Sequence, residues 1–219
     1  MARTGLASVG KRPLPASILD LTTPALILDR ARLERNAVRM RDKVQALGVT
    51  LRPHVKTSKS IDVLRVLAGD ADVPITVSTL AEARYFFALG VADILYAVGI
   101  APVKLPEVVD LIRAGCKLRV ILDTVEAADA VRAFTEAEAV AIETLIEIDS
   151  DGHRAGVGPS EPLLIEIGRR LGPVLAGVMT HAGASYECRT RAQFEAMAEQ
   201  ERALTVEAAE RLRGAGLSC

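Results

Sequence analysis

Residues 94–138 read ILYAVGIAPVKLPEVVDLIRAGCKLRVILDTVEAADAVRAFTEAE, and they contain two strand–helix units in succession. The β-branched runs 94–99 and 118–123 predict strands. Each run is followed by a segment with apolar residues at helical spacing, 105–114 and 124–138. Strands that alternate with helices in this way predict a parallel sheet with right-handed crossovers.

The same alternation extends along most of the chain and indicates an incomplete barrel. Roughly seven such units in a row favour a TIM-type (β/α) barrel over an open sheet. A complete barrel has eight strands and about 250 residues, whereas this sequence has 219 and stops where a further strand is due. We therefore expect an α/β fold, a TIM-type barrel without its final strands, with an unpaired strand at its edge. The other expected strands are 51–56, 74–79, 142–149 and 175–181, after a short apolar run at 25–29, and the other helices are 31–47, 61–68, 80–89, 161–171 and 191–213.

Composition argues against several classes of protein. The formal net charge is −1, which gives no reason to expect a nucleic acid or an anionic membrane as partner. The cysteines, at positions 116, 188 and 219, form no CxxC pair, and the histidines form no close-spaced ligand pair, so we expect neither a disulfide framework nor a metal site. Residues 1–15 lack the apolar core of a signal peptide, and no stretch is long enough to span a bilayer. We expect a cytoplasmic protein.

The segment 52–57, RPHVKT, ends one of the expected strands and carries three potential cations. Period-2 alternation places Arg52, His54 and Lys56 on one face, and a barrel has its active site where its strands end. An anionic ligand there would offset the cost of burying these charges. Nearby positive charge and desolvation lower the pKa of a lysine, and imine formation needs the neutral amine. The alternative is a solvated lysine at a strand end.

Two loops that follow other expected strands carry further candidates. The glycine-rich loop 149–158 contains Arg154, whose planar guanidinium suits a carboxylate, phosphate or phenolate oxygen. The loop 180–186 contains His181, which can stack on a ring or move protons, and Tyr186, which can hydrogen-bond a phosphate. An ordinary turn with a surface arginine and a loop with a capped histidine are the alternatives.

Thr79 and Glu82 stand at the start of the expected helix 80–89. Ser78 or Thr79 caps this helix, and Glu82 forms a capping box with Thr79. We therefore expect that Thr79 and Glu82 serve first to start this helix, and that a binding role is the second interpretation.

Taken together, five short motifs resemble the D-threonine aldolase and D-serine dehydratase-like family, in which they occur in the same order. Those proteins have the alanine racemase N-terminal barrel of the fold-type III pyridoxal-phosphate enzymes. The likeness runs from about residue 21 to the end, so we expect 1–20 to be an N-terminal extension and 21–219 a truncated cofactor-binding barrel domain. The motifs are TTPAL at 22–26, RPHVKT at 52–57, VSTLAEA at 77–83, GHRAGV at 152–157 and HAGASY at 181–186.

The resemblance implies roles for single residues. Lys56 looks like the lysine that binds pyridoxal phosphate covalently, and Arg154 like the arginine near the cofactor's phenolic oxygen and the substrate carboxylate. His181 is similar to the histidine packed against the cofactor ring, and Tyr186 to a tyrosine on the phosphate side. His54 stands where the family also has histidine. The expected catalytic residues are thus Lys56 and His54, and the expected cofactor-binding residues are Lys56, Arg154, His181, Tyr186 and Thr79.

The resemblance also implies a lyase that acts on D-3-hydroxy amino acids. It favours D-threonine aldolase-type cleavage to glycine and an aldehyde, with D-serine dehydratase activity close behind; the residues themselves do not choose among cleavage, dehydration and racemisation. Longer relatives carry a C-terminal β-domain with a divalent-metal site and form homodimers, so this chain is similar to a truncated member whose metal ligands are missing. The alternatives are a non-catalytic pyridoxal-phosphate-binding barrel, a racemase-like protein, or an unrelated barrel that binds a phosphorylated metabolite.

Overall fold

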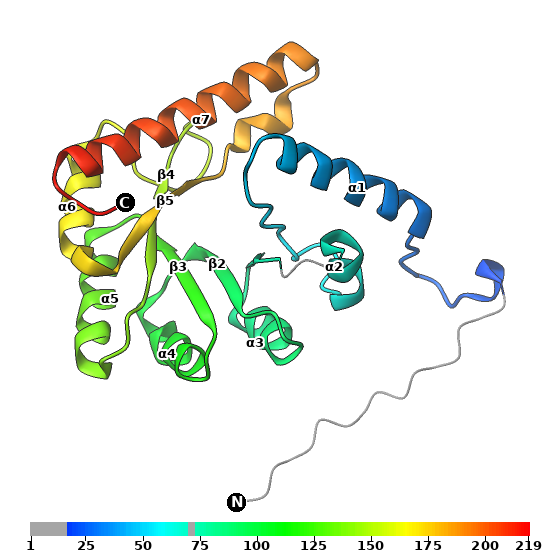
Figure 1. The fold of residues 1–219 in the computed structure, drawn as a ribbon, viewed down its shortest axis with the longest axis horizontal. Helices are drawn as coiled ribbons and strands as arrows, with labels where there is room; N and C mark the ends of the chain where they lie inside the picture. Colours follow the sequence, from blue (N-terminus) through cyan, green and yellow to red (C-terminus); the bar gives the residue numbers. More distant parts are fainter. Residues whose placement is uncertain (1–16, 70–72) are drawn as a thin grey trace, which may run out of the picture.

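The computed structural model describes residues 17–69 and 73–219, and a parallel sheet of five strands forms its centre. The strands pair in chain order, and helices line one side of the sheet (Figure 1). This arrangement confirms the expected α/β fold and its incomplete barrel. The strands are β1 (Ile75–Val77), β2 (Asp93–Gly99), β3 (Lys117–Leu122), β4 (Thr144–Ile148) and β5 (Leu175–Thr180).

The helices begin and end within one residue of the expected positions. Four of them have a Ser or Thr N-cap whose side chain accepts a backbone N–H of the first turn, at positions 60, 79, 124 and 190. The α-helices are α1 (Arg30–Ala46), α2 (Ile61–Ala68), α3 (Leu80–Ala88), α4 (Leu105–Arg113), α5 (Val125–Glu138), α6 (Pro162–Leu171) and α7 (Arg191–Gly214). Short 3₁₀ turns are η1 (Ile18–Asp20), η2 (Pro102–Lys104), η3 (Gly172–Val174) and η4 (Gly183–Glu187).

The hydrophobic core lies between the sheet and its helices. In β4, Ile146 and Ile148 are buried in the same cluster as Leu164 of α6. The alternate residues of this strand, Leu145 and Glu147, are only half-buried. Alternation of this kind places them on the inner face of the barrel, which remains accessible because the barrel is not closed.

Helix α7 is attached to the core along only part of its length. Ala208, Ala209 and Leu212 are buried, whereas residues 191–200 are almost all exposed. The N-terminal end of α7 projects beyond the sheet in Figure 1. A capping box at Thr190 closes this end of the helix.

The expected strand 51–56 is wrong, because only His54 pairs with the sheet, through an isolated bridge to Thr76. The Val55 N–H donates to the Thr76 carbonyl at 3.0 Å, and the Thr76 N–H donates to the Pro53 carbonyl at 2.9 Å. Pro53 has no N–H with which to extend this pairing, and the chain turns immediately after Val55. Lys56, the candidate for imine formation, therefore lies in a turn and not in a strand.

In the described part of the chain, β5 pairs only with β4, so its other edge is open. The apolar run 25–29 forms no strand and leaves Leu26 fully exposed. The sheet therefore has five strands, fewer than the alternation of the sequence predicts. Among the described residues, no helix combines the length and hydropathy that a membrane crossing needs.

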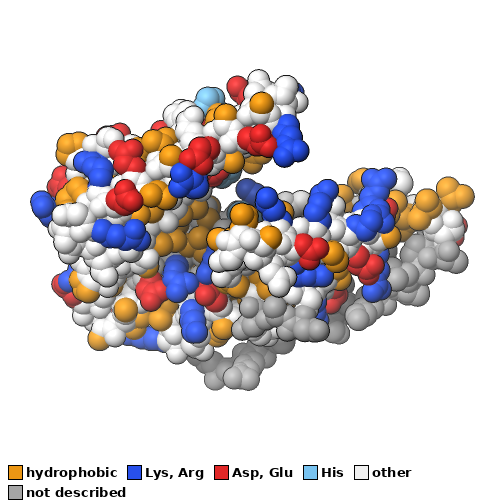
Figure 2. Space-filling view, turned by 45° about the horizontal axis from the view of Figure 1, so that its top comes forward, with side chains coloured by type: hydrophobic (Ala, Val, Ile, Leu, Met, Phe, Trp, Pro, Cys, Tyr) orange, Lys and Arg blue, Asp and Glu red, His pale blue; other side chains and the backbone are white. Residues whose placement is uncertain are grey.

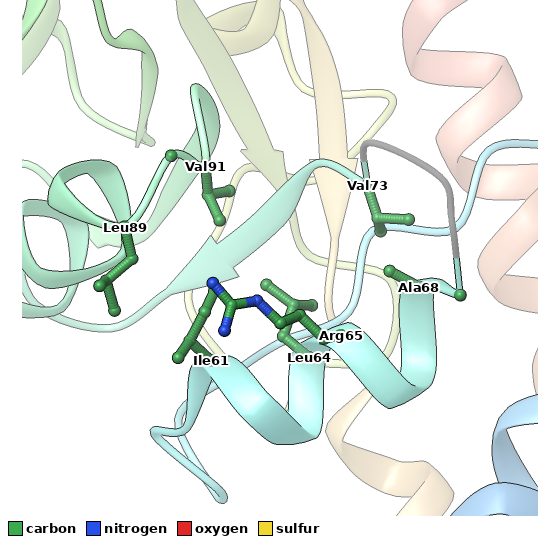
Figure 3. Close-up of a pocket in the computed structure, with 9 residues that line it drawn as sticks. Ile61, Leu64, Arg65, Ala68, Val73, Leu89 and Val91 are labelled. Carbon is green, nitrogen blue, oxygen red and sulfur yellow. The ribbon is translucent and has the colours of Figure 1, made fainter.

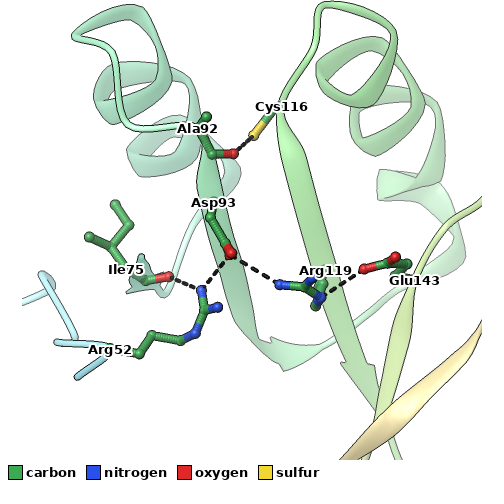
Figure 4. A network of polar contacts seen from close by, with 7 residues as sticks. All are labelled: Arg52, Ile75, Ala92, Asp93, Cys116, Arg119 and Glu143. Carbon is green, nitrogen blue, oxygen red and sulfur yellow. Dashed lines mark hydrogen bonds and ion pairs between the residues drawn. The ribbon is translucent and has the colours of Figure 1, made fainter. Parts of the chain in front are cut away.

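An ion-pair network crosses the end of the sheet at which the strands begin (Figure 4). The Asp93 carboxylate lies 2.8 Å from the Arg52 guanidinium and 3.1 Å from that of Arg119. Arg119 also contacts Glu143 at 2.7 Å. The expectation that Arg52 shares one site with His54 and Lys56 is therefore wrong, since Arg52 is neutralised by Asp93 at the opposite end of the strands.

Candidate active site

Lys56 lies in a tight turn beside the C-terminal end of β1. The Lys59 N–H closes this turn on the Val55 carbonyl at 2.9 Å, and Lys59 has a left-handed φ of 46°. The Lys56 side chain is exposed, and no carboxylate among the described residues forms an ion pair with its amine. The amine is therefore available to a ligand at the end of the sheet where a barrel has its active site.

His54 is in contact with both the turn and the end of β1. Its Nδ1 lies 3.3 Å from the Lys56 backbone nitrogen, and its Nε2 lies 3.2 Å from the Ser78 hydroxyl oxygen. Burial lowers the pKa of His54, and the positive charge of Lys56 lowers it further, against an opposing effect of Glu82. These effects favour the neutral form of the imidazole.

Glu82 is a buried carboxylate that ties the turn to α3. It accepts the Ser78 N–H at 2.8 Å and lies 3.0 Å from the Lys59 amine. Burial alone would raise the pKa of Glu82, but the Ser78 hydrogen bond and the Lys59 charge outweigh it and lower this pKa. Thr79 caps α3 by accepting the Glu82 N–H at 3.1 Å, as expected. The second half of the expected capping box is wrong, since the Glu82 carboxylate returns to Ser78 and not to Thr79.

The loop after β4 folds back onto the strand that precedes it. The Val157 N–H donates to the Glu147 carbonyl at 2.9 Å, and the Asp149 N–H donates to the Val157 carbonyl at 3.0 Å. Gly156 has a φ of 127°, and a Cβ there would lie 2.5 Å from the Asp149 nitrogen. Only glycine fits this close approach of two backbones. Gly156 therefore fixes the loop against β4.

Arg154 projects from this loop toward the loop that follows β5. A Cβ on Gly183 would lie 2.8 Å from Arg154 Cγ, so the absence of a side chain at Gly183 admits the arginine stem. The Ala184 N–H donates to the Asp151 carboxylate at 2.7 Å and joins the two loops. Two motifs that lie apart in the sequence therefore form one surface, with the exposed guanidinium of Arg154 on it.

His181 and Tyr186 belong to the same surface. Their ring centroids lie 6.1 Å apart, at an interplanar angle of 67°. Burial lowers the pKa of His181, and the charges of Arg154 and Lys56 lower it further. Lys56, Arg154 and His181 are thus close enough to influence one another, while the Tyr186 ring remains exposed. The predicted site residues, Arg52 excepted as above, lie at this one end of the sheet.

The sequence reasoning missed two carboxylates of this region. Burial raises the pKa of Glu147, and the negative charge of Asp123 raises it further, while Arg154 lowers it. Asp123, just after β3, accepts the Gly156 N–H at 3.0 Å. Glu147 occupies an inner-face position of β4, and the alternation of that strand was the signal that could have identified it.

Five pockets on the described part of the chain are lined by residues other than Lys56, Arg154 and His181. A small pocket, lined by Arg65 as well as by apolar side chains, lies between α2 and the turn before β2, on the side where the strands begin (Figure 3). In a space-filling view, a notch separates the part of the molecule that carries α7 from the part that carries α1 (Figure 2). The residues that the structure describes contain no group of three or more His, Cys, Asp or Glu side chains able to hold a metal ion.

Comparison with known proteins places this arrangement in a family. The model of the alanine racemase N-terminal domain matches residues 28–219. The chain belongs to this family. The family resemblance that the five motifs indicate is therefore confirmed, and with it the barrel as the alanine racemase N-terminal fold.

The chain is similar to proteins that are named as dehydratases of D-hydroxy amino acids. The chain is 52% identical over 207 residues to a D-threo-3-hydroxyaspartate dehydratase of Delftia sp.. The aligned region makes up 93% of this chain and 54% of the relative. It is 31% identical to a D-serine dehydratase of Schizosaccharomyces pombe over 80% of this chain and 45% of the relative.

Solved structures agree with this grouping. The structure of the Delftia dehydratase has a TM-score of 0.88 at 53% identity, and it covers 92% of this chain and 54% of that one. A D-threonine aldolase of Filomicrobium marinum has a TM-score of 0.80 at 28% identity, with coverage of 92% and 55%. The chain therefore spans about half the length of these relatives.

Proposed function

We propose that this chain forms the cofactor-binding part of a pyridoxal-phosphate-dependent lyase that removes water from D-3-hydroxy amino acids. The observation that carries the proposal is that Lys56, Arg154 and His181 all follow the C-terminal ends of strands, with Lys56 beside β1 and the Arg154 stem against Gly183 in the loop after β5. Identity favours dehydration over aldol cleavage, because it reaches 52% with the Delftia dehydratase and 29% with a D-threonine aldolase of Arthrobacter sp.. The family resemblance read from the sequence favours aldol cleavage, and the higher identity to the Delftia dehydratase is what supports the opposite order proposed here.

The donor set at this end of the sheet fits an anionic cofactor that carries an aldehyde. Lys56 offers an amine that has no carboxylate partner among the described residues, and Arg154 offers an exposed guanidinium. Burial is the main cause of the lowered pKa values of His54 and His181. The positive potential of Lys56 lowers both pKa values further, and that of Arg154 adds to it at His181. A phosphate, a phenolate oxygen or a substrate carboxylate would each be attracted by that potential.

Lys56, Arg154 and His181 have separate roles in the proposed reaction. Pyridoxal phosphate, when bound, supplies an electron sink for the bonds of the substrate's Cα. The Lys56 amine would hold the cofactor and, when free, would be the group positioned to take up the proton of the substrate's Cα. Arg154 would orient the substrate carboxylate, and the imidazole of His181 would pack against the cofactor ring. Loss of the β-hydroxyl as water leaves an enamine, and its imine tautomer then takes up one water to give a 2-oxo acid and ammonia.

An absorption spectrum of the chain with added pyridoxal phosphate tests the cofactor assignment. We expect a visible band in the parent chain that disappears in Lys56→Ala. Lys117→Ala is the matched control, because Lys117 is an exposed lysine at the opposite end of the strands. A band that persists in Lys56→Ala, or that is missing from the parent chain, would refute the assignment.

Product analysis tests the reaction. With D-threo-3-hydroxyaspartate or D-serine as substrate, dehydration predicts ammonia and a 2-oxo acid in equal amounts. Release of glycine and an aldehyde from D-threonine, without ammonia, would show that the bond cleaved is Cα–Cβ and would refute dehydration.

A further inference from the structure

The contacts of His54 determine which of its ring nitrogens carries the proton. Nδ1 faces the backbone nitrogen of Lys56 at 3.3 Å. A backbone N–H can only donate, so Nδ1 must accept and is therefore unprotonated. A neutral imidazole has one N–H, and it must then be on Nε2. Nε2 lies 3.2 Å from the Ser78 hydroxyl, which consequently accepts.

The ring is held between two elements that are themselves fixed. On the sheet side, the backbone on either side of His54 pairs with Thr76, through Pro53 and Val55, at 2.9 and 3.0 Å. The Ser78 backbone is held by the Glu82 carboxylate at 2.8 Å. His54 therefore spans from the anchored end of β1 to the turn that carries Lys56.

Both nitrogens of His54 are used by these contacts, and neither remains for a reacting group. The hydrogen bond that the Lys56 N–H donates to the side chain of His54, two residues earlier, has the pattern of an Asx-turn, which fixes a backbone turn locally. In this turn it fixes the residue that bears the candidate amine. The direction of the Lys56 side chain depends on that backbone.

We propose that His54 is a positioning residue, a neutral Nε2–H imidazole that fixes the backbone of Lys56 and thereby directs its amine toward the ligand. This inference rests on the proposed function insofar as Lys56 is the cofactor lysine. It assigns His54 a role different from the catalytic one that the sequence motifs imply.

The tautomer is measured first, in the chain without cofactor, by long-range ¹H–¹⁵N correlation NMR. The sequence has 3 histidines, so His54→Asn assigns the His54 signals by their loss. We expect an unprotonated Nδ1 and a protonated Nε2 near neutral pH. A proton on Nδ1, or rapid exchange between the two nitrogens, would overturn the inference. Because no cofactor is present, this result does not depend on the proposed function.

A matched pair of variants then separates the two ring nitrogens. The Oδ1 of His54→Asn replaces the Nδ1 acceptor for the Lys56 N–H, since asparagine is a preferred residue in such turns. His54→Gln reaches Ser78 and lacks an acceptor at the Nδ1 position. We expect the apparent Kd for pyridoxal phosphate to stay within about threefold in His54→Asn and to rise about tenfold in His54→Gln, as the loss of one well-placed hydrogen bond predicts.

Urea unfolding of both variants provides the control for a merely structural role. We expect the two unfolding midpoints to be similar, so that the difference in cofactor affinity does not follow stability. Equal affinities in the two variants, or better binding by His54→Gln, would overturn the inference. A parent chain that shows no visible band would refute the proposed function instead, and the NMR tautomer would still decide the hydrogen-bond assignment.

Discussion

Replacement of Gly156 by alanine tests how the loop that carries Arg154 is held. The φ of Gly156 is 127°, and the added Cβ would lie 2.5 Å from the Asp149 nitrogen and 2.6 Å from the Ile148 carbonyl carbon. Both contacts are to backbone, so the loop has to move. Movement breaks the hydrogen bonds between the loop and β4, at 2.9 and 3.0 Å, and the 3.0 Å bond from Gly156 to Asp123.

The magnitude follows from these contacts. Backbone strain costs about 1–3 kcal/mol, and each of the hydrogen bonds contributes about 1 kcal/mol. We expect Gly156→Ala to lower the free energy of unfolding by about 4–6 kcal/mol, a large part of the roughly 5–15 kcal/mol that holds a typical domain together.

Gly152→Ala is the matched control within the same loop. Its φ is 72°, and a Cβ there has no atom within 4 Å. This variant therefore carries only the left-handed backbone cost of about 1–2 kcal/mol. Urea unfolding followed by circular dichroism measures both variants, and the visible band with pyridoxal phosphate reports on the site. If Gly156→Ala is no less stable than Gly152→Ala, the close approach of the two backbones does not hold the loop.

Three further perturbations test other parts of the site and the fold. Gly183→Ala pushes against the flexible stem of Arg154, so we expect the free energy of unfolding to change by less than about 1 kcal/mol, while the apparent Kd for pyridoxal phosphate rises; unchanged cofactor binding would contradict the role of Arg154. Glu82→Ala removes the acceptor of the Ser78 N–H, and we expect unfolding in urea to show a loss of about 2 kcal/mol, whereas Glu82→Gln keeps an acceptor and should lose less. The pKa of Asp93 is lowered because the hydrogen bonds and charges of Arg52 and Arg119 outweigh its burial. Its stabilisation is therefore present above an unfolded pKa of about 3.9 and is lost as the pH falls through the lower folded value; the urea midpoint should fall less on acidification below about pH 4 in Asp93→Asn than in the parent chain.

Local signals explain why most elements could be predicted. The helix 61–68 is observed as α2 with the same bounds, because Ser60 caps it and Gly69 follows it. Such caps depend on neighbouring residues and are visible in the sequence. The grouping of Lys56, Arg154 and His181 could be anticipated in the same way, since each follows a strand or a strand-like run.

Pairings between distant residues could not be anticipated. The period-2 pattern of the expected strand places Arg52 on the same face as His54. In the structure, however, the charge of Arg52 is neutralised by Asp93, which lies in a different strand–helix unit. The turn after Pro53 likewise depends on the contact of His54 with β1. The sequence pattern therefore placed the lysine at the correct end of the sheet but assigned its segment the wrong structure.

The uneven burial of α7 divides the helix into parts that open at different free energies. Residues 191–200 are almost all exposed and depend on the cap and on pairs along the helix, such as Arg191 with Glu195 at 2.7 Å. Exposed pairs of this kind contribute little, so this half can unfold locally while Leu212 stays packed. The loop with His181 and Tyr186 that precedes this half is anchored separately, because the Ala184 N–H donates to the Asp151 carboxylate at 2.7 Å. We therefore expect the backbone amides of residues 191–200 to exchange with solvent sooner than those of the sheet.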